Sequence, residues 1–114
     1  MQTSDEELAE RLTSRVCVNP NGANVWYDSR DMIHRVQGPA IIHPDGTQMW
    51  YRDGLPHRDG GPAVIMEHAQ YWAQMGELHR VDGPASIWSD GRAEWYLNGQ
   101  RVSEDEHRLR TGRS

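Results

Sequence analysis

Short runs of alternating apolar and polar residues follow one another along most of this chain, and each run ends at a turn. Apolar residues return at every second position, which is the period at which side chains of a β-strand share a face. The pairs are Ala40 and Ile42, Ala63 and Ile65, Ala85 and Ile87, with Val16 and Val18 upstream. The turns contain Asn-Gly or Asp-Gly, which tolerate the positive φ angles of tight hairpins. This pattern predicts an all-β, antiparallel fold.

Two landmarks recur and interlock. The motif His-Arg-x-x-Gly-Pro-Ala begins at His34, His57 and His79, with spacings of 23 and 22 residues. A tryptophan recurs at Trp26, Trp50, Trp72 and Trp95, with spacings of 24, 22 and 23 residues. Self-similarity at a fixed period is the signature of repeat architectures. The chain is therefore predicted to hold about four tandem β-hairpin units of roughly 22 residues each, the first of them degenerate.

Glycine-containing turns divide each unit into two strands. A second turn follows three of the tryptophans, at Asp53-Gly54, Met75-Gly76 and Asn98-Gly99. In the third copy, His68 stands where the others have the first turn's glycine, and one residue is missing. A wider or bulged connection is expected there.

The two ends differ from the repeat region, which is expected to span residues 15–106. Ser4 and Glu7 form a capping-box pattern, so residues 1–14 are expected to contain a short N-terminal helix. The same pattern at 103–106 predicts a short C-terminal helical turn, followed by a polar tail over 107–114.

Charge and composition exclude several classes of function. The net charge of −5 argues against nucleic acid or an anionic membrane as partner, because such binding depends on basic patches. Cys17 is the single cysteine and lies between two valines, where a buried, inert thiol is expected. The absence of a secretory signal and of long apolar windows predicts a cytoplasmic protein with no membrane partner. No nucleophile elbow, phosphate loop or paired-cysteine motif occurs, so no enzyme activity and no cofactor are expected.

The unit from Asp45 to Ala63, Asp-Gly-x-x-x-Trp-Tyr-x-x-Gly-x-x-His-Arg-x-x-Gly-Pro-Ala, resembles the MORN-type repeats of bacterial and phage proteins. The resemblance covers about residues 15–106, with departures at Gln37, His68 and Ala73. It implies an elongated, twisted antiparallel meander whose copies contact mainly their neighbours. It also implies a binding role, since similar bacterial arrays are described as antitoxin components and longer arrays serve as docking surfaces.

The repeated polar residues are interpreted as a structural ladder. Histidines at equivalent positions would lie about 9.5 Å apart at ~4.8 Å per strand, too far to share a metal ion whose ligands lie ~2.1 Å away. No metal site is therefore expected. The arginines could bind an acidic partner or a phosphate, but arginines beside aromatic residues more commonly stack on rings or pair with carboxylates. The tryptophans are expected to form the core. The ladder comprises His34, His57, His79, Arg35, Arg58, Arg80, Trp26, Trp50, Trp72 and Trp95.

A second aromatic row is the candidate partner-binding face. Residues next to the tryptophans point to the opposite side of a strand, and a chain of this length cannot cover both faces of one sheet. The candidate residues are Tyr27, Tyr51, Tyr96, Ile41, Val64 and Trp88. This face is expected to bind a protein partner or a second copy of the chain, unless the N-terminal helix covers it.

These observations favour a non-enzymatic protein-binding module from a phage or bacterium, in a more specific version an antitoxin or an inhibitor of a host defence system. The alternative is a small-ligand-binding protein or an enzyme that uses the histidines and arginines of the ladder.

Overall fold

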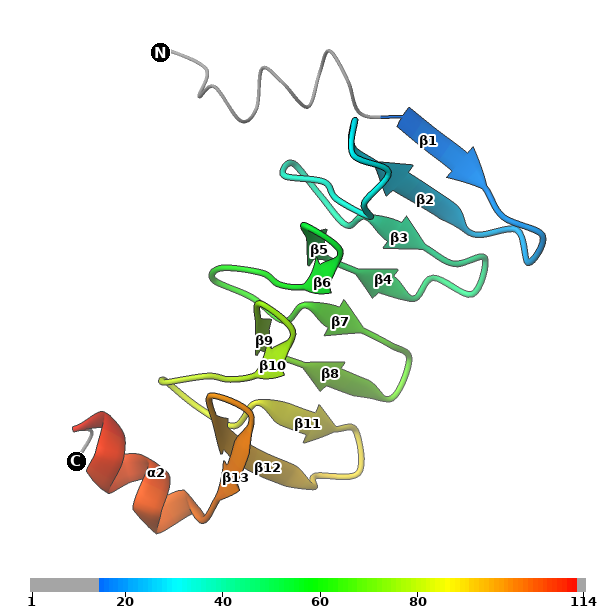
Figure 1. Ribbon diagram of the computed structural model, residues 1–114. Helices are drawn as coiled ribbons and strands as arrows, with labels where there is room; N and C mark the ends of the chain where they lie inside the picture. The colour runs from blue at the N-terminus through cyan, green and yellow to red at the C-terminus, as the bar shows by residue number, and fades with distance from the viewer. Residues whose placement is uncertain (1–14, 113–114) are drawn as a thin grey trace, which may run out of the picture.

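The computed structural model describes residues 15–112, so the helix expected within residues 1–14 lies outside the described residues. The described chain is mostly antiparallel β-sheet, as the alternating pattern predicts (Figure 1). The main sheet has nine strands, in the order β1 (Arg15–Val18), β2 (Asn24–Tyr27), β3 (Ile41–Ile42), β4 (Gln48–Met49), β7 (Val64–Ile65), β8 (Ala69–Tyr71), β11 (Ser86–Trp88), β12 (Ala93–Leu97) and β13 (Gln100–Val102). Strands therefore follow one another in chain order, as in a meander.

Two short hairpins lie beside the main sheet (Figure 1). They are β5 (Tyr51–Arg52) with β6 (Leu55–Pro56), and β9 (Ala73–Gln74) with β10 (Glu77–Leu78). Trp50 separates β4 from β5, and Trp72 separates β8 from β9. The backbone of Trp50 still bonds on both sides, because its N–H donates to Ala63 (2.7 Å) and its carbonyl accepts from His57 (3.0 Å). Each of these two tryptophans thus marks the point where the chain leaves the main sheet for a second hairpin.

The two kinds of turn use glycine differently. We call the first turn of a unit, before the tryptophan, the outer turn, and the second turn, after it, the inner turn. At the outer turn, the N–H of His43 donates to the carbonyl of Thr47 (2.9 Å) and only Gly46 has a positive φ, of 92°. This is a type I turn closed by a left-handed glycine. At the inner turn, Asp53 and Gly54 both have positive φ, 54° and 80°, as a type I′ turn requires. Both reversals follow the predicted turn residues.

The connection in the third copy is tighter than expected. The N–H of Met66 donates to the carbonyl of Ala69 at 2.8 Å, which leaves Glu67 and His68 as a two-residue turn. Neither residue has a positive φ. The expectation of a wider or bulged connection is therefore wrong. Losing one residue removed the glycine that closes the longer turn, and the shorter loop needs no left-handed position.

The fully buried apolar residues are small. Ala40, Ala63 and Ala85, the alanines of the Gly-Pro-Ala motif, are each 0% exposed. The backbone of Ala40 bonds to both neighbouring strands, donating to Met49 (2.8 Å) and accepting from Trp26 (2.8 Å). The tryptophans expected to form the core are only half-buried. Alanine therefore fills the most crowded row of the sheet.

The chain ends in helix α2 (Glu104–Thr111), which is longer than the expected turn and occupies most of the segment expected as a tail. Ser103 caps the helix by accepting a hydrogen bond from the N–H of Glu106 (3.0 Å), as the capping pattern predicts. His107 is 1% exposed, and its Nε2 donates to the carbonyl of Arg80 at 2.6 Å. This bond fastens α2 to the end of the sheet.

Strand β1 is exposed along its whole length, including Cys17. The expectation of a buried thiol is therefore wrong. The Val-Cys-Val sequence gives an apolar strand, but β1 pairs with β2 alone among the described strands. Within residues 15–112, no helix combines the length and apolar character required to cross a bilayer.

Candidate functional site

Each histidine of the ladder binds the backbone of the following inner turn. Nδ1 of His34 accepts from the N–H of Asp53 (3.0 Å), that of His57 from Met75 (3.0 Å), and that of His79 from Asn98 (2.9 Å). These donors are the non-glycine residues with positive φ in the three turns. Since Nδ1 accepts, the proton of the neutral ring is on Nε2. The histidines therefore tie each turn to the hairpin before it.

Each arginine of the ladder stacks on the tryptophan that precedes it in the sequence. The guanidinium carbon lies 4.0 Å from the ring centre in Arg35–Trp26 and 3.8 Å in both Arg58–Trp50 and Arg80–Trp72. Nη1 also donates to the carbonyl of Pro39, Pro62 or Pro84, at 3.2, 3.1 and 3.2 Å respectively. We call these three pairs the arginine–tryptophan stacks. They match the ring stacking expected from the sequence.

Glycine makes room for the stacks on the other face of the guanidinium. A Cβ at Gly61 would lie 2.8 Å from the Cζ of Arg58, and one at Gly83 would lie 2.9 Å from that of Arg80. The corresponding distance at Gly38 is 3.4 Å, an ordinary contact. None of these glycines has a positive φ. At Gly61 and Gly83, glycine is therefore needed for close approach and not for backbone conformation.

Trp95 has no arginine stacked on it among residues 15–112. The ladder positions seven and eight residues after it hold Val102 and Ser103. Helix α2 follows at once and packs on this end of the sheet, with the bond from His107 to Arg80 described above.

The candidate partner-binding face is divided into two groups. Ile41 and Val64 lie in one cross-strand row, and Trp88 is two residues from Ser86 of that row. The tyrosines instead pair beyond the tryptophans: Tyr27 with Ile33, Tyr51 with Pro56 and Tyr96 with Arg101. The chain leaves the main sheet at Trp50, so Tyr51 is separated from Ile41 and Val64, whereas Tyr27 and Tyr96 lie within β2 and β12 of the main sheet. Simple alternation along a straight strand could not reveal the break at Trp50.

The sequence interpretation also missed members of the row. Register places Val25, Met49 and Tyr71 directly across from Ile41 and Val64. Tyr71 and Trp88 form an edge-to-face pair, with ring centres 6.0 Å apart. We call the set Val25, Ile41, Met49, Val64, Tyr71 and Trp88 the apolar row. Met49 and Tyr71 each precede a ladder tryptophan by one residue, a signal that alternation could have supplied.

A polar cluster that the sequence did not suggest joins Asp28, Arg30 and Asp53. The guanidinium of Arg30 pairs with both carboxylates, and Asp28 also accepts from the N–H groups of Arg30 (2.8 Å) and Met32 (3.2 Å). Burial acts to raise the pKa of Asp28, but the bonds from Arg30 and Met32 outweigh it and lower that pKa. The bond from Arg30 lowers the pKa of Asp53. Both carboxylates are therefore held in their ionised form.

The same cluster includes the only group of possible metal ligands among the described residues. Ligand atoms of Asp28, His34 and Asp53 lie within 4.8 Å of one another. The guanidinium of Arg30 already binds both carboxylates, and Nδ1 of His34 accepts from the backbone. A cation would have to displace Arg30, so the geometry favours an ion-pair cluster.

No protein-family model matches this chain. No curated protein matches it, and no solved structure does either.

Proposed function

We propose that this chain is a non-catalytic protein-binding module, built as a MORN-like array of four hairpin units, whose sheet face receives a protein partner or a second copy of the chain. The observation that carries the proposal is the apolar row. Its side chains cross six neighbouring strands, β2 to β11 in sheet order, and five of the six residues remain half-exposed. Continuous apolar surface of this kind marks interfaces.

The ladder residues support a binding role over a catalytic one. His57 and Arg58 each use polar atoms to bind backbone, and Arg58 also stacks on Trp50. A histidine whose Nδ1 accepts a structural hydrogen bond cannot use that nitrogen as a base. The double substitution His57→Ala with Arg58→Ala separates the two classes. Loss of folding supports the structural role, and a folded protein that has lost a small-molecule ligand supports the alternative.

Photo-crosslinking in cells tests the face directly. Met66 is 44% exposed, lies two residues beyond Val64 and points to the same side of its strand. A photoreactive amino acid at position 66 should give a discrete adduct, with an identified partner or with a second copy. The same residue at position 109 on α2, where Leu109 is 82% exposed, is the matched control.

The expected result is an adduct at position 66 that is absent at position 109 and disappears when Tyr71→Ser interrupts the apolar row. Equal labelling at both positions contradicts the proposal. A strict monomer by light scattering with no adduct at position 66 does so as well.

The more specific role is that of an antitoxin or a phage-encoded inhibitor of a host defence enzyme, as the resemblance to MORN-type arrays suggests. Co-expression with the products of neighbouring genes tests it. Rescue of growth or inhibition of the enzyme by the wild-type chain, lost in the Tyr71→Ser variant, is the expected outcome.

A further inference from the structure

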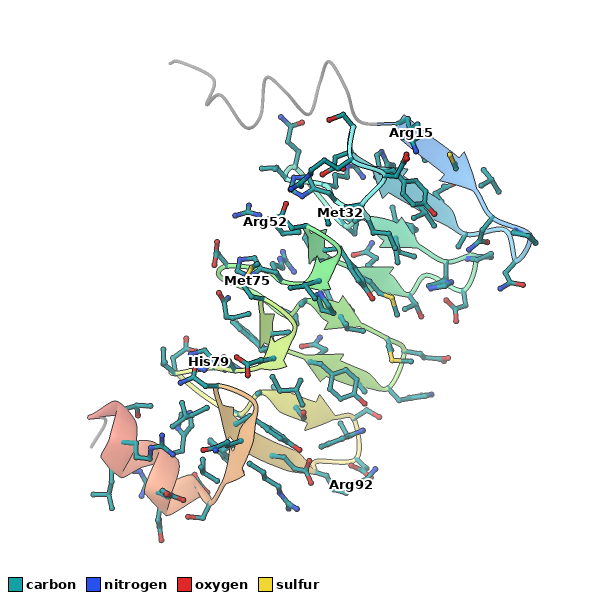
Figure 2. All side chains as sticks on the ribbon, in the orientation of Figure 1. Arg15, Met32, Arg52, Met75, His79 and Arg92 are labelled. Carbon is teal, nitrogen blue, oxygen red and sulfur yellow. The ribbon has the colours of Figure 1, made fainter. Side chains whose placement is uncertain are left out.

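A pocket lies between two successive loops of the ladder. Its volume is about 490 Å³, and it is lined by residues 35–39, by 50–52 around the start of β5, and by 57–59. We call it the first inter-loop pocket. Figure 2 shows Arg52 on the same side of the sheet as Met75 and His79, where the second hairpins lie. The pocket is therefore separate from the apolar row.

The first inter-loop pocket is positively charged on a protein whose net charge is −5. Two ladder arginines line it, Arg35 and Arg58, against the single carboxylate of Asp59, and Arg52 lines it as well. A second pocket of about 370 Å³ lies one ladder step along the sheet, and its lining contains one arginine, Arg80, and one carboxylate, Asp82. The two pockets thus share their architecture and differ in charge.

The pairing of the ladder arginines also differs between the two pockets, at the position two residues after each ladder arginine. Asp82 occupies it after Arg80, and its Oδ1 accepts from Nε of Arg80 at 2.8 Å. Gln37 and Gly60 occupy it after Arg35 and Arg58. Within residues 15–112, no carboxylate pairs with Arg35 or Arg58, and each guanidinium donates one hydrogen bond, to a proline carbonyl. Both guanidinium groups therefore retain donors for a ligand.

The lining indicates which ligand these donors suit. A guanidinium presents a planar fork that pairs with carboxylate or phosphate oxygens. The overall negative charge and the carboxylate of Asp59 oppose a dianion more strongly than a monoanion. Val36, Trp50 and Tyr51 supply apolar wall for the methylene groups of a side chain. These features fit a glutamate or aspartate side chain better than a free phosphate.

We propose that the first inter-loop pocket binds an acidic side chain of the protein partner, with Arg35 and Arg58 as its anion-binding residues. This inference rests on the proposed function, since it names a chemical feature of the partner. The partner would then make an ionic contact in the pocket at the side of the sheet, in addition to the apolar contact with the apolar row. The second pocket does not bind an acidic side chain, because Arg80 is already paired with the carboxylate of Asp82.

Titration of the isolated chain with blocked peptides tests the inference without a known partner. The probes are acetylated, amidated tetraglutamate and tetraglutamine, with inorganic phosphate as a third arm, followed through the Nε–Hε NMR signals of Arg35 and Arg58. Saturable shifts with tetraglutamate alone are expected. Equal shifts with tetraglutamine, no shifts, or tighter binding of phosphate would overturn the proposal.

Two substitutions, each of which gives one pocket the charge pattern of the other, make the test more specific. Gln37→Asp adds the missing carboxylate and should weaken tetraglutamate binding about tenfold, whereas the neutral control Gln37→Asn should not. Asp82→Asn should create a second site, seen as new shifts at Nε of Arg80. Unchanged binding in Gln37→Asp contradicts the inference. The peptide titration does not involve the apolar row. The inference can therefore fail while crosslinking at position 66 still supports the proposed function. Likewise, the crosslinking can fail while the pocket still binds tetraglutamate.

Discussion

Nδ1 of His57 accepts a hydrogen bond from the backbone N–H of Met75 at 3.0 Å, across the gap between two successive inner hairpins. The N–H of Gly76, the next residue, donates to the carbonyl of Pro56 at 2.8 Å. Two consecutive amides of one turn are thus held by two consecutive residues of the previous hairpin. The same pair of bonds occurs at His34 with Ile33 and at His79 with Leu78.

Removing the imidazole should loosen this connection. We expect His57→Ala to lower the free energy of unfolding by about 1–3 kcal/mol, because the amide of Met75 loses its acceptor. His57→Asn should retain more stability, since its side-chain oxygen can take the place of Nδ1. Urea unfolding measures both. The control is His68→Ala, at an exposed turn position, with an expected change within about 0.5 kcal/mol. Equal stability of the two alanine variants would refute the structural role of His57.

Met75 is a candidate for stabilisation. It has a φ of 46° in a turn position where the other two copies carry Asp53 and Asn98. A left-handed conformation costs an ordinary L-residue roughly 1–2 kcal/mol, and asparagine less. Met75→Asn should therefore raise the free energy of unfolding by about 1 kcal/mol, measured by the urea midpoint. Met66→Asn is the matched control, because Met66 is similarly exposed but has no positive φ. A gain in both variants would show that the backbone is not the cause.

The close approach of arginine to glycine predicts unequal effects of one substitution at three places. Gly61→Ala should cost about 1–3 kcal/mol, because the added Cβ would push Arg58 off Trp50 and away from Pro62. Gly38→Ala should cost clearly less, since its Cβ would make an ordinary contact with Arg35. Thermal unfolding of the two variants, together with the tryptophan fluorescence spectrum, provides the comparison. A larger loss at Gly38 would contradict the packing described for the stacks.

The Asp28 cluster predicts acid sensitivity. The pKa of Asp28 is lower in the folded chain than its usual value of about 3.9, so its contribution to stability is present above that value. The contribution is lost as the pH falls through the lower, folded-state pKa. The free energy of unfolding should therefore decrease from about pH 5 towards pH 2.

Asp28→Asn should be about 1–3 kcal/mol less stable than the wild type at neutral pH and should show a shallower acid decrease. Glu67→Gln, at an exposed turn position, should leave the pH profile unchanged. Urea unfolding between pH 2 and 7 distinguishes them. Parallel profiles for Asp28→Asn and the wild type would exclude Asp28 as the source.

Local pattern and periodicity predicted much of this fold. The turn residues and the alternating alanines located the strands, because turn conformation and strand periodicity are local properties. The capping residues at Ser103 located the start of α2, but its length depended on the contact of His107 with Arg80, which is not local. The exposure of Cys17 likewise depended on where β1 lies in the sheet.

The candidate site was predicted less completely. Arginine next to an aromatic series favoured ring stacking, and three such stacks are present. The separation of Tyr51 from Ile41 and Val64 follows from the break at Trp50, which alternation does not reveal. The cluster of Asp28 with Asp53 and the charge of the first inter-loop pocket each join residues from different hairpins, so neither has a signal in a single stretch of sequence.

Gln74 and His107 each donate a hydrogen bond from Nε2 to the backbone carbonyl of a ladder arginine. Gln74 donates to Arg58 at 2.8 Å, and His107 donates to Arg80. The helix therefore substitutes for one contribution of a following hairpin. A hairpin inserted between existing hairpins would meet amide and carbonyl partners in the correct register. A hairpin added after α2 would not, because the carbonyl of Arg80 already accepts a hydrogen bond from His107. Genetic duplication of an internal hairpin could thus lengthen the sheet while the contacts between hairpins stay the same.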